Sequence, residues 1–247
     1  MTSLLTFARR AGITAACLLA TQAQAATVAL SNITGAWFNP DPAAVITSNT
    51  GADTANAQIR WAASGYDFLA AADTSVVVPP SPSATFNVAN FQHVNQPVGA
   101  AITSVSLRIM ADIEVDGFSV GTKSFFFDFL HDETPNGDDP CAYGGANGSG
   151  VNINGCADRV SVAFSDASES FLIGSDLYTV NIIGFLAGGG LVTDFLTAEL
   201  ATNTAALVAN VTLRSDLTVP EPGSLALVGF SLAALGAMRR RRQQARA

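Results

Sequence analysis

The clearest pattern in the chain is an alternation of apolar and polar side chains over residues 105–116, which Met110 alone interrupts. A period of two is typical of a strand that buries one face and exposes the other. The dipeptide Asp116-Gly117 ends this run and favours a tight turn, after which the alternation resumes up to residue 129. The two runs predict an antiparallel hairpin in the core of the fold. Its apolar positions are Val105, Leu107, Ile109, Ala111, Ile113, Val115, Phe125, Phe127 and Phe129.

Shorter runs of the same kind occur on both sides of this hairpin, separated by segments rich in Gly, Asn and Pro. A short helix is expected over 192–206, where Phe195, Leu196 and Leu200 have helical spacing. Many short strands with little helix indicate an all-β protein, and we expect an antiparallel β-sandwich with a jelly-roll-like arrangement as one form of it. The other strands are expected over 27–38, 58–62, 66–69, 84–91, 160–164, 177–185 and 207–213.

The N-terminal segment has the pattern of a signal peptide. Arg9-Arg10 precede an apolar stretch over 11–20, and Ala23-Gln24-Ala25 is a small-x-small cleavage site. We therefore expect cleavage after Ala25 and export of the following chain across the inner membrane.

The C-terminal segment combines three features in a fixed order. The motif Val219-Pro220-Glu221-Pro222 precedes an apolar stretch over 223–238, and Arg239–Arg242 follow. As a helix this stretch would be roughly 24 Å long, against about 30 Å of bilayer hydrocarbon. It therefore predicts a short transmembrane helix, with the arginines in the cytoplasm and the preceding chain outside. An ordinary C-terminal anchor is the alternative.

This order of motif, short span and basic cluster resembles the PEP-CTERM sorting signal of Gram-negative bacteria. The resemblance implies that exosortase, a membrane protease, cuts near Pro-Glu-Pro and releases the protein or re-attaches it at the cell surface. It implies three parts, a signal peptide (1–25), an exported domain (26–218) and the sorting signal (219–247). The expected location is the cell surface or the extracellular matrix, after transient anchoring in the inner membrane.

Charge is distributed unevenly along the chain. Seven of the 12 basic residues lie in the terminal segments, whereas 19 of the 20 acidic residues lie between residues 26 and 218. The five basic and 19 acidic residues of this segment give it a net charge of about −14. Such a surface repels nucleic acid, favours solubility and attracts cations. Nucleic acid is therefore excluded as a partner.

Two cysteines remain after removal of a signal peptide that contains Cys17. Cys141 and Cys156 lie in a long loop, residues 131–158, that is rich in Gly, Asn and Asp. An even pair in an oxidising compartment predicts one disulfide.

The same loop contains oxygen-bearing side chains at alternating positions followed by glycine, as in the first half of a calcium loop. Pro135 and Tyr143 depart from the EF-hand pattern, and a solvated acidic loop is the alternative. Calcium is the cofactor that this stretch suggests. The expected ligands are Asp132, Thr134, Asn136, Asp138 and Asp139.

His93 and Asn95 follow an expected strand and precede a proline. This stretch resembles the THxN family of PEP-CTERM proteins, with Gln92 in place of the threonine. Gly35-Ala36-Trp37 and Glu133-Thr134-Pro135-Asn136 extend the resemblance, which implies no activity. Both side chains are expected to bond backbone groups and fix a turn. Alternatively, His93 and His131 bind zinc or another transition metal with Asp132 or Glu133.

The sequence favours a protein that is not an enzyme. It has no His-Glu-x-x-His motif and no phosphate-binding loop. We expect a structural or binding component of a polysaccharide-containing biofilm matrix. A carbohydrate-binding module is the alternative, with Trp37, Trp61 and Tyr66 stacking on sugars unless they are buried in the core. A polysaccharide hydrolase is a further alternative, because a carboxylate pair has no fixed sequence spacing.

Overall fold

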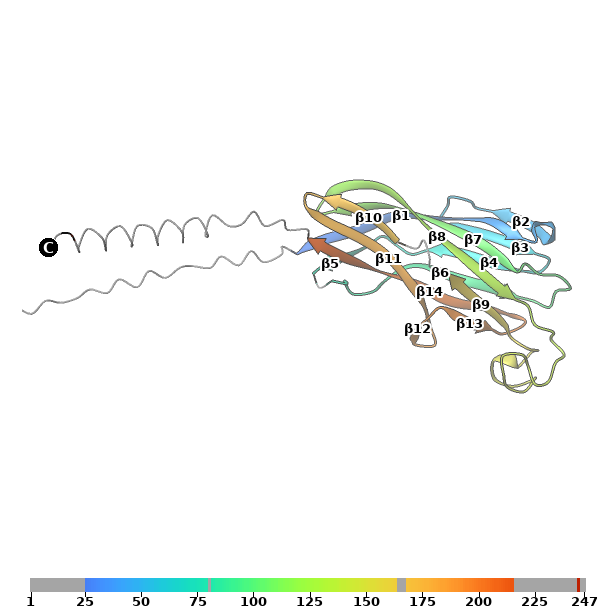
Figure 1. The fold of residues 1–247 in the computed structure, drawn as a ribbon. Helices are drawn as coiled ribbons and strands as arrows, with labels where there is room; N and C mark the ends of the chain where they lie inside the picture. The colour runs from blue at the N-terminus through green and yellow to red at the C-terminus, as the bar shows by residue number, and fades with distance from the viewer. Residues whose placement is uncertain (1–24, 80, 164–167, 216–243, 245–247) are drawn as a thin grey trace, which may run out of the picture.

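The computed structural model describes residues 25–79, 81–163, 168–215 and 244, which form two antiparallel sheets (Figure 1). Every pairing between the described strands is antiparallel. The regular helical elements in this part of the chain are two single turns, η1 (Ala43–Val45) and η2 (Gly150–Asn152). The prediction of an all-β antiparallel fold is confirmed, and the jelly-roll-like arrangement stays a prediction.

Among the described residues, the first sheet has six strands and the second has eight. The first runs in the order β13 (Asp194–Thr197), β9 (Asp158–Ala163), β8 (Phe118–Asp132), β7 (Ser104–Val115), β1 (Ala26–Asp41), β5 (Thr74–Val78). The second runs β10 (Ser168–Ile173), β11 (Asp176–Ala187), β14 (Ala201–Ser215), β6 (Phe86–Asn95), β4 (Ser64–Ala70), β3 (Asn56–Trp61), β2 (Ile46–Thr50). Strand β12 (Gly190–Val192) pairs with β11 outside this path.

The predicted central hairpin is formed by β7 and β8. Val115 pairs with Phe118 across the turn, and burial alternates along β7 as the sequence pattern requires. Asp116 and Gly117 both have positive φ, 49° and 84°. Two successive positive φ angles are the condition for the turn that matches the twist of a two-residue hairpin, which explains the Asp-Gly pair.

Aromatic side chains from both sheets meet in one core. Phe129 of β8 stacks on Phe91 of β6 with ring centroids 5.0 Å apart. Trp37 of β1 packs on Tyr66 of β4 at 5.6 Å and on Phe129 at 5.2 Å. The contacts of Phe129 with Phe91 and of Trp37 with Tyr66 cross from one sheet to the other, so they join the two layers.

The expected helix over 192–206 is wrong. This segment forms β13 and, after a short connection, the start of β14. Phe195 places its ring 5.3 Å from Phe185 and 5.8 Å from Phe91, so it belongs to the core between the sheets. The apolar spacing that suggested a helix comes from two separate strands, and tertiary packing overrides it.

The expected end of the strand before His93 is also wrong. β6 continues to Asn95, and His93 lies within it, paired with Tyr66 of β4 and Asn203 of β14. The chain turns only after Asn95, close to the proline at position 97. Side chains in this strand therefore point alternately into and out of the sandwich.

The start of β1 and the end of β14 lie at one end of the sandwich, and the loop with η2 lies at the other (Figure 1). The proposed signal-peptide residues 1–24 and the sorting residues Val219, Pro220, Glu221 and Pro222 lie outside the described residues, as does the apolar stretch 223–238. Within the described residues, no helix has the length and apolar character needed to cross a membrane.

Replacing Phe129 by Ala tests the aromatic core. Phe129 is 1% exposed, so the variant leaves a cavity between the sheets and should lose about 3–5 kcal/mol of unfolding free energy. Phe118→Ala on the same strand is the matched control, because Phe118 is 71% exposed and its loss should change stability by no more than about 0.5 kcal/mol. Urea denaturation measures both, and equal effects of the two variants would contradict this packing.

Candidate functional site

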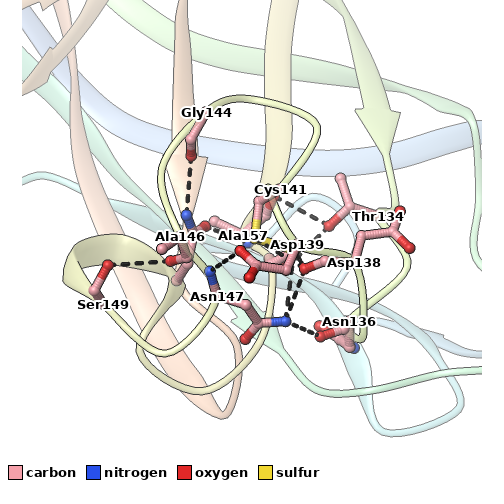
Figure 2. The surroundings of a disulfide bond; sticks show 12 residues. Thr134, Asn136, Asp138, Asp139, Cys141, Gly144, Ala146, Asn147, Ser149 and Ala157 are labelled. Carbon is pink, nitrogen blue, oxygen red and sulfur yellow. Dashed lines mark hydrogen bonds between the residues drawn. A yellow bond between two sulfur atoms is a disulfide. The ribbon is translucent and has the colours of Figure 1, made fainter.

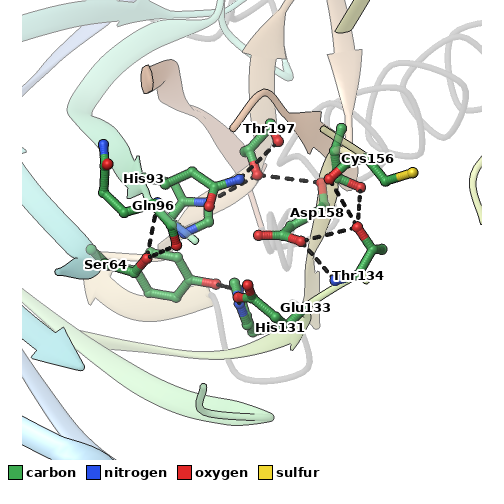
Figure 3. Close-up of polar contacts among 12 residues, drawn as sticks. Ser64, His93, Gln96, His131, Glu133, Thr134, Cys156, Asp158 and Thr197 are labelled. Atoms are coloured by element: carbon green, nitrogen blue, oxygen red, sulfur yellow. Dashed lines mark hydrogen bonds and ion pairs between the residues drawn. The ribbon is translucent and has the colours of Figure 1, made fainter. Parts of the chain in front are cut away.

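A cluster of buried polar side chains lies between the sheets, near the end that carries the η2 loop (Figures 1 and 3). We call it the polar cluster, and it consists of His93, His131, Glu133, Asp158 and Glu199. His93, Asp158 and Glu199 are fully buried, and the side chain of Glu133 is only 20% exposed. Charged groups are seldom buried without partners, so the contacts of this cluster require explanation.

Strand alternation brings the two histidines together. On β6, His93 lies two residues after the buried Phe91, and on β8, His131 lies two residues after the buried Phe129. Each histidine therefore extends an inward row of aromatic residues by one position. Because the rows face each other across the sandwich, the two imidazole rings approach to 5.1 Å between centroids.

His93 has one bonded and one unbonded ring nitrogen. Its Nδ1 lies 2.9 Å from the Thr197 hydroxyl, which in turn donates to the backbone carbonyl of Asp158 at 3.3 Å. The hydroxyl proton is thus used, so Nδ1–H donates to Thr197 and Nε2 carries the lone pair. Among the described residues Nε2 has no hydrogen-bond partner. Burial lowers the pKa of His93 well below its ordinary value, with the nearby His131 adding to the effect, so the ring is neutral.

His131 is bonded at both ring nitrogens. Nδ1 lies 2.7 Å from the Tyr66 hydroxyl, and Nε2 lies 3.2 Å from Glu133 Oε2. The contact with Tyr66 crosses from the first sheet to the second, as does the contact between His93 and Thr197. Polar bonds therefore continue the connection between layers that the aromatic rings begin.

Asp158 is the carboxylate at the centre of the cluster. Its Oδ1 accepts a hydrogen bond from the Thr134 backbone N–H at 2.8 Å. Its Oδ2 is buried and has no partner among the described residues. Burial raises the pKa of Asp158 to about 6, with Glu133 adding to the rise and the Thr134 N–H opposing it.

Glu199 lies in the connection between β13 and β14. Its Oε2 is also buried and has no partner among the described residues. The Asn136 side chain, oriented with its NH2 group toward the carboxylate, donates to Oε1 at 3.3 Å. Burial, followed by the charges of Asp158 and Glu133, raises the pKa of Glu199 to about 7.

Two overlapping groups of potential metal ligands result. His93, His131 and Asp158 each place a ligand atom within 4.8 Å of the others, and so do Glu133, Asp158 and Glu199. Asp158 belongs to both groups. Imidazole with carboxylate is the donor set that zinc and related transition metals prefer.

The disulfide predicted between Cys141 and Cys156 is present and closes the loop beside the polar cluster (Figure 2). Inside this loop the Asn147 side-chain amide donates to the carbonyls of Asn136 at 2.8 Å and Asp138 at 3.0 Å. Asp139 accepts from the Asn147 backbone N–H at 3.2 Å. The loop is therefore organised by its own bonds, and it leads directly into Asp158.

The expected calcium ligands make contacts of other kinds. Asp132 accepts a hydrogen bond from the Tyr143 hydroxyl and lies 3.9 Å from Arg159. Thr134 is buried, and its hydroxyl donates to the Cys156 carbonyl at 2.9 Å. Among the described residues, the two ligand groups include neither Asp132 nor Asp138 nor Asp139. The calcium loop stays a prediction.

The alternative prediction for His93 and His131 is a transition-metal site with Asp132 or Glu133. The structure brings the two histidines together, but it adds Asp158 where Asp132 was expected, because Asp132 points outward on β8. Asn95 donates to the Thr197 carbonyl at 3.0 Å, so it bonds a backbone group as expected, although it does so inside a strand. Trp37, Trp61 and Tyr66 are at most 3% exposed, so they belong to the core and form no platform for sugars.

Sequence reasoning missed Asp158, Glu199 and Thr197. A signal for Asp158 was available, since it has the same alternation phase as the buried Val160 and Val162 of β9. An acidic residue at an inward position of a strand indicates a buried site. Glu199 has no comparable signal, because it lies in a connection.

The raised pKa values of Asp158 and Glu199 predict a loss of stability with rising pH when EDTA is present. The unfolded chain releases these protons near the ordinary values of 3.8 and 4.5, whereas the folded protein retains them to about 6 and about 7. The folded state binds more protons in this window, so these two groups lower the unfolding free energy as pH rises from about 4 to about 7. The difference between wild type and Asp158→Asn/Glu199→Gln in urea denaturation isolates their contribution. A pH-independent difference would contradict the burial of these carboxyls.

Removal of the disulfide should destabilise the protein by about 3 kcal/mol, because the two cysteines are 15 residues apart and the unfolded chain gains the corresponding freedom. The variant is Cys141→Ala/Cys156→Ala, measured by urea denaturation. Wild type in reducing buffer is the control and should lose a similar amount. An unchanged midpoint in both would show that the bond does not constrain the unfolded chain.

Comparison with known proteins places the C-terminal segment in a family. Residues 218–242 match the PEP-CTERM protein-sorting motif, in agreement with the resemblance of Val219–Arg242. No curated protein matches the chain. The last described strand, β14, ends at Ser215, and the matched motif begins three residues later. The chain therefore carries a PEP-CTERM sorting motif at its C-terminal end, which supports export and processing by exosortase.

Proposed function

We propose that the protein is a non-catalytic component of the cell surface or the extracellular matrix. The observation that carries this proposal is the PEP-CTERM motif at residues 218–242, which directly follows a domain built of two antiparallel sheets. A sorting motif of this kind delivers its domain outside the inner membrane, where a disulfide between Cys141 and Cys156 is stable.

The position of the two domain ends supports a role as a displayed domain. The chain leaves β14 at Ser215, at the end of the sandwich opposite the disulfide loop (Figure 1). A domain attached through this end presents the disulfide loop and the polar cluster away from the membrane. Its net charge of about −14 keeps such domains soluble and apart when they are crowded on a surface.

The burial of the polar cluster argues against hydrolysis of polysaccharides. His93, Asp158 and Glu199 are fully buried, so a polymer cannot reach their side chains. Gly117-Phe118-Ser119-Val120-Gly121 has the spacing of a hydrolase nucleophile motif, but it lies at the β7–β8 hairpin instead of a strand-to-helix turn. Ser119 and His131 lie at opposite ends of β8, about 40 Å apart along the strand.

A carbohydrate-binding module remains the second candidate from the sequence. The residues on which it rested, Trp37, Trp61 and Tyr66, are buried, and no other described contact favours a sugar ligand. The matrix-component role is therefore preferred.

Processing by exosortase provides the test. We expect the full-length chain, produced in a host that has exosortase, to yield a surface or released form whose intact mass lacks the residues after the Pro-Glu-Pro motif. In a host without exosortase, and in the variant Pro220→Ala/Glu221→Ala/Pro222→Ala, the longer form should accumulate in the membrane fraction.

The matched control is Glu114→Gln, an exposed acidic residue of β7, which should be processed like wild type. Equal processing of the motif variant, or of wild type without exosortase, would refute the sorting route. Turnover of a polysaccharide by the purified surface form would refute the non-catalytic role.

A further inference from the structure

The polar cluster contains three carboxylates and two imidazoles without a balancing cation among the described residues. The closest basic side chain along the chain, Arg159, lies 3.9 Å from the exposed Asp132 and stacks over Tyr143 at 4.6 Å. We propose that His93, His131, Asp158 and Glu133 bind one divalent transition-metal ion, with zinc the best match, and that this ion ties the two sheets together.

The first argument is the unbonded lone pair of His93. The Thr197 hydroxyl accepts from Nδ1–H and donates its own hydrogen bond to the Asp158 backbone carbonyl, so Nε2 is left as an acceptor in a fully buried position. Asp158 Oδ2 is a second buried acceptor without a described partner. Two buried acceptors cannot bond each other, but both can bind a cation.

The second argument is the way in which the imidazoles are oriented. A metal-binding histidine is generally positioned by a hydrogen bond at its other ring nitrogen. Thr197 provides that bond for His93 at 2.9 Å, and the Tyr66 hydroxyl provides it for His131 at 2.7 Å. Both histidines thus have Nδ1 engaged, which leaves Nε2 as the metal-binding nitrogen; that of His131 lies 3.2 Å from Glu133 Oε2.

The third argument is distance. Zinc bonds of about 2.0–2.2 Å in a tetrahedron place neighbouring ligand atoms about 3.3–3.5 Å apart. His131 Nε2 and Glu133 Oε2 lie 3.2 Å apart, which fits two ligands of one ion. The atoms of His93, His131 and Asp158 lie within 4.8 Å of one another, so small side-chain movements close the site.

The donor types decide between metals. Calcium and magnesium prefer oxygen ligands alone, whereas two imidazoles with carboxylates suit zinc and its neighbours. Four protein ligands in a buried position leave no open coordination site for a substrate, which is the arrangement of structural zinc. The ion would therefore stabilise the protein and perform no chemistry.

The ligands come from separate parts of the fold. His93 belongs to β6 of the second sheet, while His131 and Asp158 belong to β8 and β9 of the first (Figure 3). Glu133 and Asp158 also lie near the two ends of the long loop, residues 131–158, that the disulfide closes. One ion would join both layers and the base of that loop.

The test uses the full-length chain in detergent, stripped with EDTA and titrated with zinc chloride. We expect about one zinc per chain by elemental analysis. At a zinc concentration 100-fold above its Kd, the melting temperature should rise by about 5–10 °C. His93→Gln and Asp158→Asn should lose this rise and bind zinc at least about 100-fold more weakly.

Folding of the variants is checked in EDTA. Asp158→Asn should melt at or above the wild-type temperature at neutral pH, because it removes a buried carboxylate and keeps an oxygen for Thr134. Asp128→Asn, which alters an exposed carboxylate on β8, is the matched control and should keep the full zinc response.

Three results would overturn the proposal: an unchanged melting temperature of wild type with zinc, an equal zinc response in His93→Gln, or an equal rise with calcium at the same concentration. The last result would point to an oxygen-only site instead. None of these outcomes bears on exosortase processing, so the metal site and the proposed function fail independently.

Discussion

The two-sheet structure depends on contact between aromatic side chains that point inward from facing strands. Phe129 and Phe91 stack across the sandwich, and Trp37 and Tyr66 pack beside them. Burial of rings of this size supplies a large share of the free energy that offsets the ordering of the chain. The same period of two that points Phe129 inward also points His131 inward. The polar cluster is therefore a continuation of the core and owes its position to the core.

This continuity places an electrostatic demand on the fold. Carboxylates taken from water require a proton, a hydrogen-bond donor or a cation. The Thr134 N–H supplies a donor to one oxygen of Asp158. Burial without further donors raises the pKa of Asp158 to about 6 and that of Glu199 to about 7. A divalent ion between the imidazoles and carboxylates would meet the same demand at neutral pH without protonation. Protonation and metal binding would thus both neutralise the polar cluster, and they differ in how strongly they join the two sheets.

The sequence predicts the interior of the sandwich better than its edges. β7 and the part of β8 from Phe125 onward follow from their alternation, because each buries one face there. Strands such as β2 and β5 lie at sheet edges, where one side of the ladder is open and few side chains are buried, so their pattern is weak. The polar cluster was likewise only partly predictable from the sequence. The sequence suggested, as one alternative, that His93 and His131 lie together. Glu199 lies in the connection between β13 and β14, so only the packing of the two sheets shows that it belongs to the polar cluster.

The place of β14 within its sheet has a mechanical consequence. β14 is bonded to β11 over Ala206–Ser215 and to β6 over Ala201–Ala209, and the chain leaves it at Ser215 toward the sorting motif. A pull applied at Ser215 runs parallel to the strand, so many backbone bonds in two ladders must shear together before any one of them opens. Tension from flowing water on a tethered molecule would be spread over the middle of the sheet, whereas the same force on an edge strand would peel it away bond by bond.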